Sequence, residues 1–460
     1  MLQGAEKALL RSIRSVLALG TLSLSAQALC ATLTVNTTSD TRVPGATCSL
    51  RKAIENANTN ATLHPECPPA GDYGADTIVF DPLAFPPDHM TTSTLSGQLY
   101  LTDASTTTID GGGVVALDGG GHTRIFLLSG SANLEGLTIS NGYAADNGGG
   151  MLVIGTATID RCTFTGNVAQ KSGGGAIFRA AGQLTVKSST LIGNGSVSTT
   201  YYGGAIYSTG PGSLTVIGST LSNNKANGYG GAIDARSQLT VKDSLISGNH
   251  AYSGGGIRLY GHYDLLLTGT TLVGNVASGS GDSAGGGIAI FGPASGPSST
   301  PVLTNDTFYK NLGGLYGGAI FNGANSELTV TNSTIVANMP TTIRSVAPTT
   351  FLNSILVGAS LNCIAFPFDA GVVDAGGNIE NGDSCGFTAA AGSLSSTDPK
   401  LVAPPSNNGG PTPTLALAAS SPAFHFAFGC PSTDQRGMSR PSAACDTGAF
   451  EETLFFSGFE

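Results

Sequence analysis

Residues 184–194 read LTVKSSTLIGN, a stretch in which the apolar side chains at the third and eighth positions alternate with small polar ones. Alternation over such short runs, with many β-branched residues, indicates β-strands. The same 11-residue motif recurs at intervals of 25 to 36 residues, as ATIDRCTFTGN (157–167), LTVIGSTLSNN (214–224), LTVKDSLISGN (239–249), LLLTGTTLVGN (265–275), PVLTNDTFYKN (301–311) and LTVTNSTIVAN (328–338). This repeat predicts an all-β fold, a single-stranded right-handed parallel β-helix in which each repeat forms one coil.

Every copy of the motif ends in asparagine. Stacked coils bring equivalent side chains over one another, so each amide can bond the next coil and satisfy polar groups at a buried corner. We therefore expect a structural ladder formed by Asn167, Asn194, Asn224, Asn249, Asn275, Asn311 and Asn338. At the sixth motif position Cys162 replaces the serine or threonine of most other copies, and there we expect a buried thiol rather than a nucleophile. The Gly-Gly pairs that precede most copies predict sharp turns.

The remaining cysteines lie outside the repeats, where the chain is least able to hold itself together. Their number fits an oxidising compartment, and no spacing typical of a zinc site occurs. Local spacing favours three disulfides, which would join Cys48 to Cys67, Cys363 to Cys385 and Cys430 to Cys445.

Three parts of the chain resemble known families. The repeats are similar to the GGA[IL] and FxxN repeats of chlamydial polymorphic outer membrane proteins, which are surface β-helices. The segment 33–58, with Cys48-Ser49-Leu50-Arg51, Lys52 in place of Glu, and then Ala53, resembles the CSLREA domain of secreted bacterial repeat proteins. The segment 407–451, which includes Thr433-Asp434-Gln435-Arg436-Gly437 and Cys445-Asp446-Thr447-Gly448-Ala449-Phe450-Glu451, resembles the choice-of-anchor Q domain. These resemblances imply a pectate-lyase-like solenoid displayed or released outside the cell, with no agreed activity.

The domain organisation follows from these features. Residues 1–31 have a positive start and a short apolar run that are typical of a signal peptide, and no later segment is predicted to cross a membrane as a helix. We expect a CSLREA-like cap at 32–94, the β-helix at 95–362, a choice-of-anchor Q-like region at 363–451 and a short tail at 452–460. An amphipathic helix at 49–59 would cap the first coil, and the disulfide-stapled C-terminal segment would cap the last, because open coil edges would recruit other chains. The protein should therefore be secreted or lie on the outer surface of a bacterium.

The strand after each Gly-Gly pair offers a candidate site. Its shared isoleucine should point inward, so the next residue and the one two positions further on should point outward. On neighbouring coils this places together Tyr207, Asp234, Arg236, Arg258 and Tyr260. Exposed aromatic rings with one acid and two bases could bind an acidic glycan. The competing interpretation is an exposed Asp-Arg ion pair of little energetic value, beside aromatic rings covered by a loop.

Two functions are compatible with this patch. We favour a non-enzymatic interaction or adhesin-type protein that binds a glycan or another cell-surface component. The alternative is a polysaccharide lyase or glycoside hydrolase with Asp234, Arg258 and Tyr260 as catalytic candidates, although one carboxylate disfavours hydrolysis. The net charge of −10 argues against nucleic acid. Two Asp-Gly-Gly-Gly segments, at Asp110 and Asp118, are compatible with calcium but more typical of tight turns; otherwise no cofactor or metal is expected.

Overall fold

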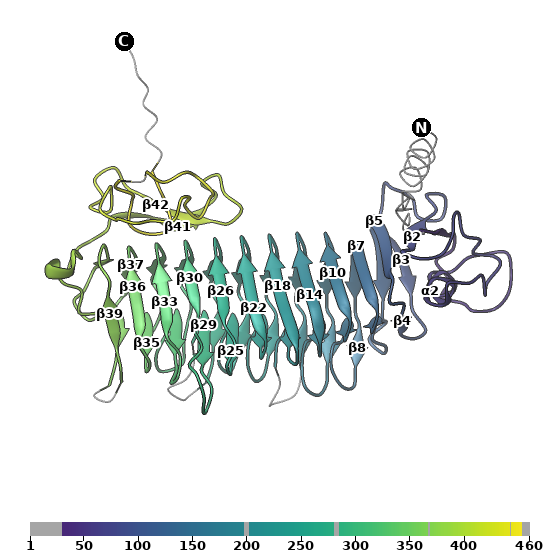
Figure 1. Cartoon of the computed structure of the whole chain (residues 1–460), viewed down its shortest axis with the longest axis horizontal. Helices are drawn as coiled ribbons and strands as arrows, with labels where there is room; N and C mark the ends of the chain where they lie inside the picture. The colour runs from purple at the N-terminus through teal and green to yellow at the C-terminus, as the bar shows by residue number, and fades with distance from the viewer. Residues whose placement is uncertain (1–29, 197–201, 280–284, 367–368, 442, 453–460) are drawn as a thin grey trace, which may run out of the picture.

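The computed structural model (Figure 1) describes residues 30–196, 202–279, 285–366, 369–441 and 443–452. The predicted signal peptide lies outside these residues except for its last two positions, and so does the predicted tail after residue 452. Within the described part, the repeats stack as the predicted elongated solenoid, and all pairings between its coils are parallel except for one antiparallel bridge near its N-terminal end.

Each repeat supplies strands to two neighbouring rows. The first motif residues form β10 (Thr156–Asp160), β14 (Gly182–Lys187), β18 (Gly212–Ile217), β22 (Gln238–Lys242), β26 (Leu265–Thr268), β30 (Val302–Thr304), β33 (Leu328–Thr331) and β36 (Thr349–Leu352). Positions seven to nine form β11 (Thr163–Thr165), β15 (Thr190–Ile192), β19 (Thr220–Ser222), β23 (Leu245–Ser247), β27 (Thr271–Val273), β31 (Thr307–Tyr309), β34 (Thr334–Val336) and β37 (Ile355–Val357). Equivalent residues pair between coils, so Val186 lies between Ile159 and Val216.

Two further rows complete each coil. The strands after the Gly-Gly pairs are β9 (Met151–Val153), β13 (Ile177–Arg179), β17 (Ile206–Ser208), β21 (Ile233–Ala235), β25 (Ile257–Tyr260), β29 (Ile288–Phe291), β32 (Ile320–Asn322), β35 (Ile343–Ser345) and β38 (Cys363–Ile364), which continue from β4 (Leu99–Leu101) and β6 (Phe126–Leu128). A short row contains β8 (Tyr143–Ala144), β12 (Val168–Ala169), β16 (Gly195–Ser196), β20 (Lys225–Ala226), β24 (His250–Ala251) and β28 (Val276–Ala277). The apolar motif positions face inward and form one buried core along the stack.

The corner between the two motif strands lies at the fifth position. In the seven motif copies and in the next coil, this residue has a positive φ of 45° to 64°. L-residues adopt this left-handed conformation at a cost, which Gly, Asn and Asp bear most easily. These three types supply six of the eight residues, which are Arg161, Ser188, Gly218, Asp243, Gly269, Asn305, Asn332 and Asn353. The motif therefore encodes the bend as well as the strands.

The seven motif asparagines form a continuous ladder. The side-chain Nδ2 of Asn194 donates to Oδ1 of Asn224 at 3.0 Å and to the carbonyl of Phe164 at 3.0 Å, and its backbone N–H donates to the same Oδ1. Equivalent amide bonds of 2.9 or 3.0 Å join each of the seven to the next. All seven are buried, so the ladder satisfies polar groups that water does not reach.

A second ladder runs along the sixth motif position, and the sequence pattern alone did not reveal it. The backbone N–H of Ser189 donates to Oγ of Ser219, and that of Ser219 donates to Oγ of Ser244, both at 3.1 Å. Each hydroxyl also donates to the backbone carbonyl two residues earlier in the sequence, as Ser219 does to Ile217 at 2.9 Å. Cys162 occupies the same row and is buried.

The N-terminal end carries the predicted helix. After β1 (Thr32–Val35), α2 (Leu50–Thr59) begins at the N-cap Ser49 and buries Leu50, Ala53, Ile54 and Ala57. Cys48 and Cys67 form a disulfide beside it. The Arg51 guanidinium binds both carboxylate oxygens of Asp40 at 2.7 Å and donates to two carbonyls just before β4. Arg51 therefore holds this helix against the first coils.

The first and last coils use the remaining strands. The N-terminal coils contain β2 (Thr77–Phe80), β3 (Thr91–Thr94), β5 (Thr106–Asp118) and β7 (Ser131–Ser140). After β38 come β39 (Val372–Asp374), β40 (Ile379–Glu380) and the short 3-10 helix η1 (Ala389–Ala391). The Cys363–Cys385 disulfide closes this segment, and Phe387 packs against Phe351 of the last motif-like coil with ring centroids 6.0 Å apart.

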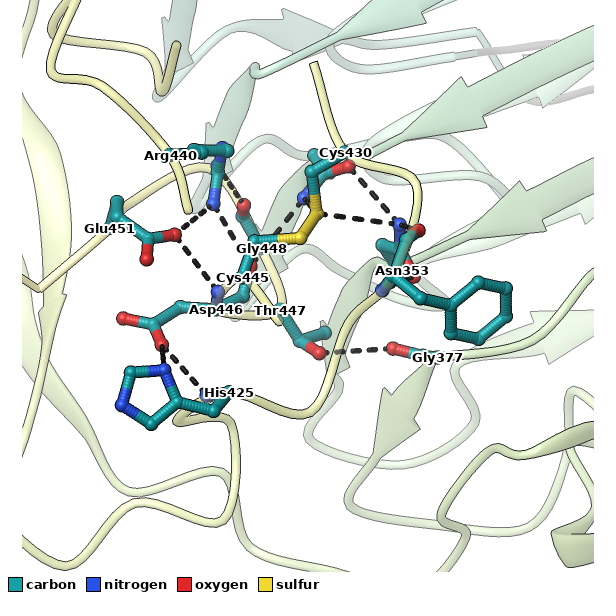
Figure 2. The surroundings of a disulfide bond; sticks show 12 residues. Asn353, Gly377, His425, Cys430, Arg440, Cys445, Asp446, Thr447, Gly448 and Glu451 are labelled. Carbon is teal, nitrogen blue, oxygen red and sulfur yellow. Dashed lines mark hydrogen bonds and ion pairs between the residues drawn. A yellow bond between two sulfur atoms is a disulfide. The ribbon is translucent and has the colours of Figure 1, made fainter. Parts of the chain in front are cut away.

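The rest of the C-terminal region has a different position from the one expected. Residues 399–441 and 443–452, with β41 (Leu401–Ser406) and β42 (Thr414–Leu417), lie along the side of the last coils rather than over the open end (Figure 1). The third disulfide, Cys430–Cys445, lies in this side-docked segment (Figure 2). The expected cap is therefore provided by the part that Cys363–Cys385 closes, because Phe387 supplies its apolar contact with the core.

Candidate ligand-binding patch

The candidate patch begins on three adjacent strands. In β17, β21 and β25, the isoleucine at the first position is fully buried, and the next residue lies on the opposite side of the strand. The register pairs Tyr207 with Asp234 and Asp234 with Arg258. Arg236 follows β21, and Tyr260 ends β25. The five residues singled out in the sequence therefore gather on one face of neighbouring coils.

The competing interpretation, an exposed ion pair, is wrong for Asp234 and Arg258, because this pair is buried. The side chain of Asp234 has no exposed surface and that of Arg258 is 4% exposed, with 2.6 Å between the carboxylate Oδ2 and the guanidinium Nε. Arg236 lies farther from the carboxylate, at 3.8 Å, and keeps 29% of its side chain exposed. Tyr207 is also buried.

Two tyrosines that the sequence analysis did not select cover the ion pair. Tyr202 and Tyr229 each directly precede a Gly-Gly-Ala-Ile segment, so the recurring Tyr before Gly-Gly was the missed signal. The Arg258 guanidinium carbon lies 3.9 Å from the ring centroid of Tyr229 and 5.4 Å from that of Tyr260. The Arg236 guanidinium carbon lies 4.1 Å from the ring centroid of Tyr202 and 5.1 Å from that of Tyr260. Both cations thus lie between aromatic rings.

Part of this cluster reaches solvent. Tyr260 is 45% exposed and Tyr252 is 42% exposed, and the ring of Tyr252 meets that of Tyr229 edge to face at 6.2 Å. The most exposed parts of the patch are therefore these two tyrosine rings, beside the partly exposed Arg236.

The patch carries a net positive charge in a protein whose net charge is −10. Burial raises the pKa of Asp234, although both arginines oppose this shift. Burial acts against the charge on Arg236, but Tyr207 and Asp234 outweigh it and raise the pKa of this guanidinium. One carboxyl group faces two guanidinium groups, so the sum is positive whether Asp234 is ionised or neutral. Arg258 is closer to that carboxyl group than Arg236 is. The Asp234 carboxylate therefore compensates the charge of Arg258 more fully than that of Arg236.

This geometry suits binding better than proton transfer. A general base must reach the proton that it abstracts, whereas Arg258 is buried and bound to Asp234. A partly exposed guanidinium can instead bind a carboxylate or sulfate in a bidentate manner, and tyrosine rings offer flat amphipathic surfaces.

In the two segments considered for calcium, the first of which is an irregularity within β5, each aspartate binds the backbone two residues later. The carboxylate Oδ1 of Asp110 accepts from the backbone N–H of Gly112 at 2.9 Å, and that of Asp118 accepts from the N–H of Gly120 at 2.8 Å. Among the described residues, no three His, Cys, Asp or Glu side chains gather in a way that could hold a metal ion. Nor does this part of the chain contain a helix with the length and hydropathy needed to span a bilayer.

The stacked coils, their two polar ladders and their aromatic face define a β-solenoid protein. The chain belongs to the right-handed β-helix family: the family described as right handed beta helix region matches it over residues 97–277 and 200–365.

The chain is 28% identical over 300 residues to the probable outer membrane protein pmp7 of Chlamydia pneumoniae, covering 55% of this chain and 31% of that protein. The chain therefore spans about a third of the length of this relative. It is also similar to the pectate lyase Pel9A, with 13% identity, a TM-score of 0.48 and coverage of 92% and 96% of the two chains.

Proposed function

We propose that this protein is a secreted or surface-exposed β-helix of interaction or adhesin type that binds an acidic glycan through the patch of Tyr252, Tyr260 and Arg236. The observation that carries the proposal is the burial of Asp234 against Arg258, since it leaves Arg236 partly exposed and incompletely compensated between aromatic rings. A carboxylate or sulfate of the glycan would bind Arg236, while the sugar rings of the glycan would stack on the two exposed tyrosines.

Other features support a position outside the cell. Three disulfides are typical of proteins that fold in an oxidising compartment. The curated relative is described as a probable outer membrane protein. The stretch at 1–31 has the composition of a signal peptide. We accordingly propose secretion or surface display, and we retain the resemblance of the two ends to the CSLREA and choice-of-anchor Q domains as part of this proposal.

The binding experiment uses immobilised polygalacturonate, alginate, hyaluronate and chondroitin sulfate, with a neutral glucan for comparison. We expect retention on at least one acidic polymer and a marked loss at high salt, because an exposed charge pair is screened. Tyr260→Ala and Arg236→Gln should each weaken binding by about 1–2 kcal/mol, or roughly 5- to 30-fold.

Matched surface variants control for general effects. Tyr100→Ala removes a ring that is 50% exposed, and Arg161→Gln removes a guanidinium that is 60% exposed, both away from the patch. Neither should change retention. If no acidic polymer is retained, or if the control variants weaken binding as much as the patch variants, the proposal is wrong.

The same panel tests the enzymatic alternative. A lyase or hydrolase would release unsaturated uronates or reducing ends, and Arg258→Ala would stop the release. We expect retention without product, and no effect of a calcium chelator on retention. If product forms and its formation requires Arg258, the patch is an active site and the binding proposal is wrong.

A further inference from the structure

A second arginine occupies the same outward row as Arg258. The strand register runs from Arg258 through Ala289 and Phe321 to Arg344, which is three coil-to-coil steps away. Tyr316 directly precedes Gly317-Gly318, as Tyr229 precedes Gly230-Gly231 in the first patch. In both places this tyrosine belongs to the coil just before the arginine.

The surroundings of Arg344 repeat those of Arg258. Its guanidinium carbon lies 4.4 Å from the ring centroid of Phe366 and 6.0 Å from that of Tyr316, and the two rings meet edge to face at 5.5 Å. The guanidinium forms a buried ion pair with Asp369. Phe366 is 40% exposed, close to the 45% of Tyr260. Each arginine thus lies beside a tyrosine from a Gly-Gly turn, a carboxylate and one exposed ring.

Aromatic side chains also occur between the two clusters. Phe321 follows Ala289 in the row, and its ring lies 5.2 Å from that of Phe291, which is half-buried at the end of β29. Neighbouring parallel strands are about 4.8 Å apart, so three steps place the two arginines about 14 Å from one another along the solenoid.

We propose that Tyr316, Arg344 and Phe366 form a second subsite, and that the ligand is an acidic polysaccharide chain that lies along the solenoid axis and contacts both clusters. This inference rests on the proposed glycan binding at the first patch. The first cluster has two cations and one carboxyl group, whereas Arg344 is matched by Asp369. The first subsite therefore binds an acidic group, and the second stacks a sugar ring on Phe366. Occupying both with one chain makes the second contact intramolecular and raises the affinity.

The test measures affinity against chain length, with size-graded oligomers of polygalacturonate, alginate, hyaluronate and chondroitin sulfate from disaccharides to dodecasaccharides. For the polymer that is retained, we expect affinity to rise about tenfold or more once the oligomer exceeds the span of about 14 Å between the clusters. Phe366→Ala should abolish this rise but leave disaccharide binding unchanged. Tyr260→Ala should weaken the binding of short and long oligomers alike.

Two further variants separate stacking from local folding. Phe366→Leu keeps an apolar side chain beside Arg344 but removes the ring, and it should behave as Phe366→Ala does. Leu361→Ala alters a neighbouring side chain that is 46% exposed and should have no effect. If affinity is independent of length, or if Phe366 variants weaken disaccharides too, the second subsite is overturned while the first patch stands. If no oligomer or polymer binds at all, the proposed function itself fails.

Discussion

The outward face formed by motif positions seven and nine has two halves with different environments. On β11, β15, β19 and β23, which we term the open flank, these residues face outward with no other segment of the described chain docked on them. On β27, β31, β34 and β37, which we term the covered flank, residues 399–452 lie over them. The seventh position is threonine in most coils of both halves: Thr163, Thr190 and Thr220 against Thr271, Thr307 and Thr334. The same hydroxyl row therefore meets solvent in one half and protein in the other.

Two of the three covered hydroxyls are matched by one glutamine. The Thr307 hydroxyl donates to Oε1 of Gln435 at 2.6 Å, and Nε2 of Gln435 donates to the hydroxyls of Thr271 at 2.8 Å and Thr412 at 2.9 Å. Farther along, the backbone N–H of Ala449 donates to the Thr334 hydroxyl at 2.9 Å. Buried hydroxyls are tolerated only when they are hydrogen-bonded, so this row specifies where the segment docks.

The ninth position distinguishes the halves in sequence. On the open flank it is Thr165, Ile192, Ser222 and Ser247, whereas on the covered flank it is Val273, Tyr309, Val336 and Val357. Tyr309 and Val336 are buried together with Leu415 of β42, and Val273 and Val357 pack at the edge of this cluster. The inward positions that determine the fold therefore keep the same residue types in both flanks, whereas the ninth position changes where the coil packs against another segment.

The largest effect should come from Arg440, which anchors the covering segment. Its side chain is 1% exposed and bonds Glu451 at 2.8 Å and the backbone carbonyls of Asp446 and Gly448 (Figure 2). It also bonds the Asn305 side chain. Arg440→Met would leave Glu451 buried without its partner, so we expect a loss of about 3–5 kcal/mol. Hydrogen exchange should show the loss in residues 399–452 rather than in the ladder amides of the solenoid.

The corner just before the open flank supplies the matched control. Arg161 contacts Glu135 and Asp160 with 60% of its side chain exposed, so Arg161→Met should change stability by less than about 1 kcal/mol. Equal losses for the two variants would show that burial by the C-terminal segment does not distinguish the flanks.

The next effect should come from Gln435. Gln435→Ala removes three hydrogen bonds and leaves the Thr307 hydroxyl without its acceptor, so we expect a loss of about 2–3 kcal/mol. Limited proteolysis should cut the covering segment of this variant faster. Thr220→Val, at the equivalent of Thr271 on the open flank, should stay within about 0.5 kcal/mol. A Gln435 variant as resistant to protease as the parent protein would contradict the docking role of this row.

Much of this architecture was predictable from the motif. The period, the asparagine row and the inward positions fix the coils, because stacking repeats the same local geometry in each turn. The position of residues 399–452 was not predictable in this way, since no repeat relates them to the coils; the change at Val273, Tyr309 and Val336 was visible but had no partner assigned to it. The helix at α2 followed from local amphipathicity.

The sequence predicted that five of the patch residues lie side by side, but it did not predict their burial or the three further tyrosines Tyr202, Tyr229 and Tyr252. Alternation along β21 and β25 correctly placed Asp234 and Arg258 on the outward side of the strands. It could not show that Tyr202 and Tyr229 fold back over them, because those rings come from turns whose direction depends on tertiary contacts. The same limitation concealed the equivalent roles of Tyr229 and Tyr316.

A smaller effect is expected where the covered half interrupts the hydroxyl ladder. Asp306 is fully buried in the sixth-position row, and its Oδ1 accepts from the backbone N–H of Thr270 at 2.8 Å. Burial raises the pKa of this carboxyl well above 3.8. Because the unfolded chain releases this proton above about pH 4 while the folded chain retains it, the free energy of unfolding falls as the pH rises above this value.

Asp306→Ser should restore the hydroxyl that Ser219 provides on the open flank, which donates to the carbonyl two residues earlier. Near pH 4 we expect that bond to raise the free energy of unfolding by about 0.5–1.5 kcal/mol over the parent protein. The difference should increase toward neutral pH, because only the parent protein then bears the cost of a buried carboxyl group that the unfolded chain would ionise. Urea unfolding at several pH values measures both. A variant less stable than the parent at pH 7 would show that Asp306 contributes favourable contacts in its ionised form.

The smallest effect is expected at Cys162, which interrupts the same ladder on the open side. Its Sγ donates to the Asp160 carbonyl at 3.3 Å, and its N–H donates to Oγ of Ser189 at 3.0 Å, so serine can make the same bonds. Cys162→Ser should therefore alter stability by about 0.5 kcal/mol or less. Burial raises the pKa of the thiol to about 12, which leaves a thiolate fraction of about 10⁻⁴ at pH 8. Iodoacetamide should label Cys162 only after unfolding, whereas the exposed Cys30 should react at once, so the labelled site is identified by peptide mapping. Rapid labelling of Cys162 in the folded protein would instead mean that this coil opens.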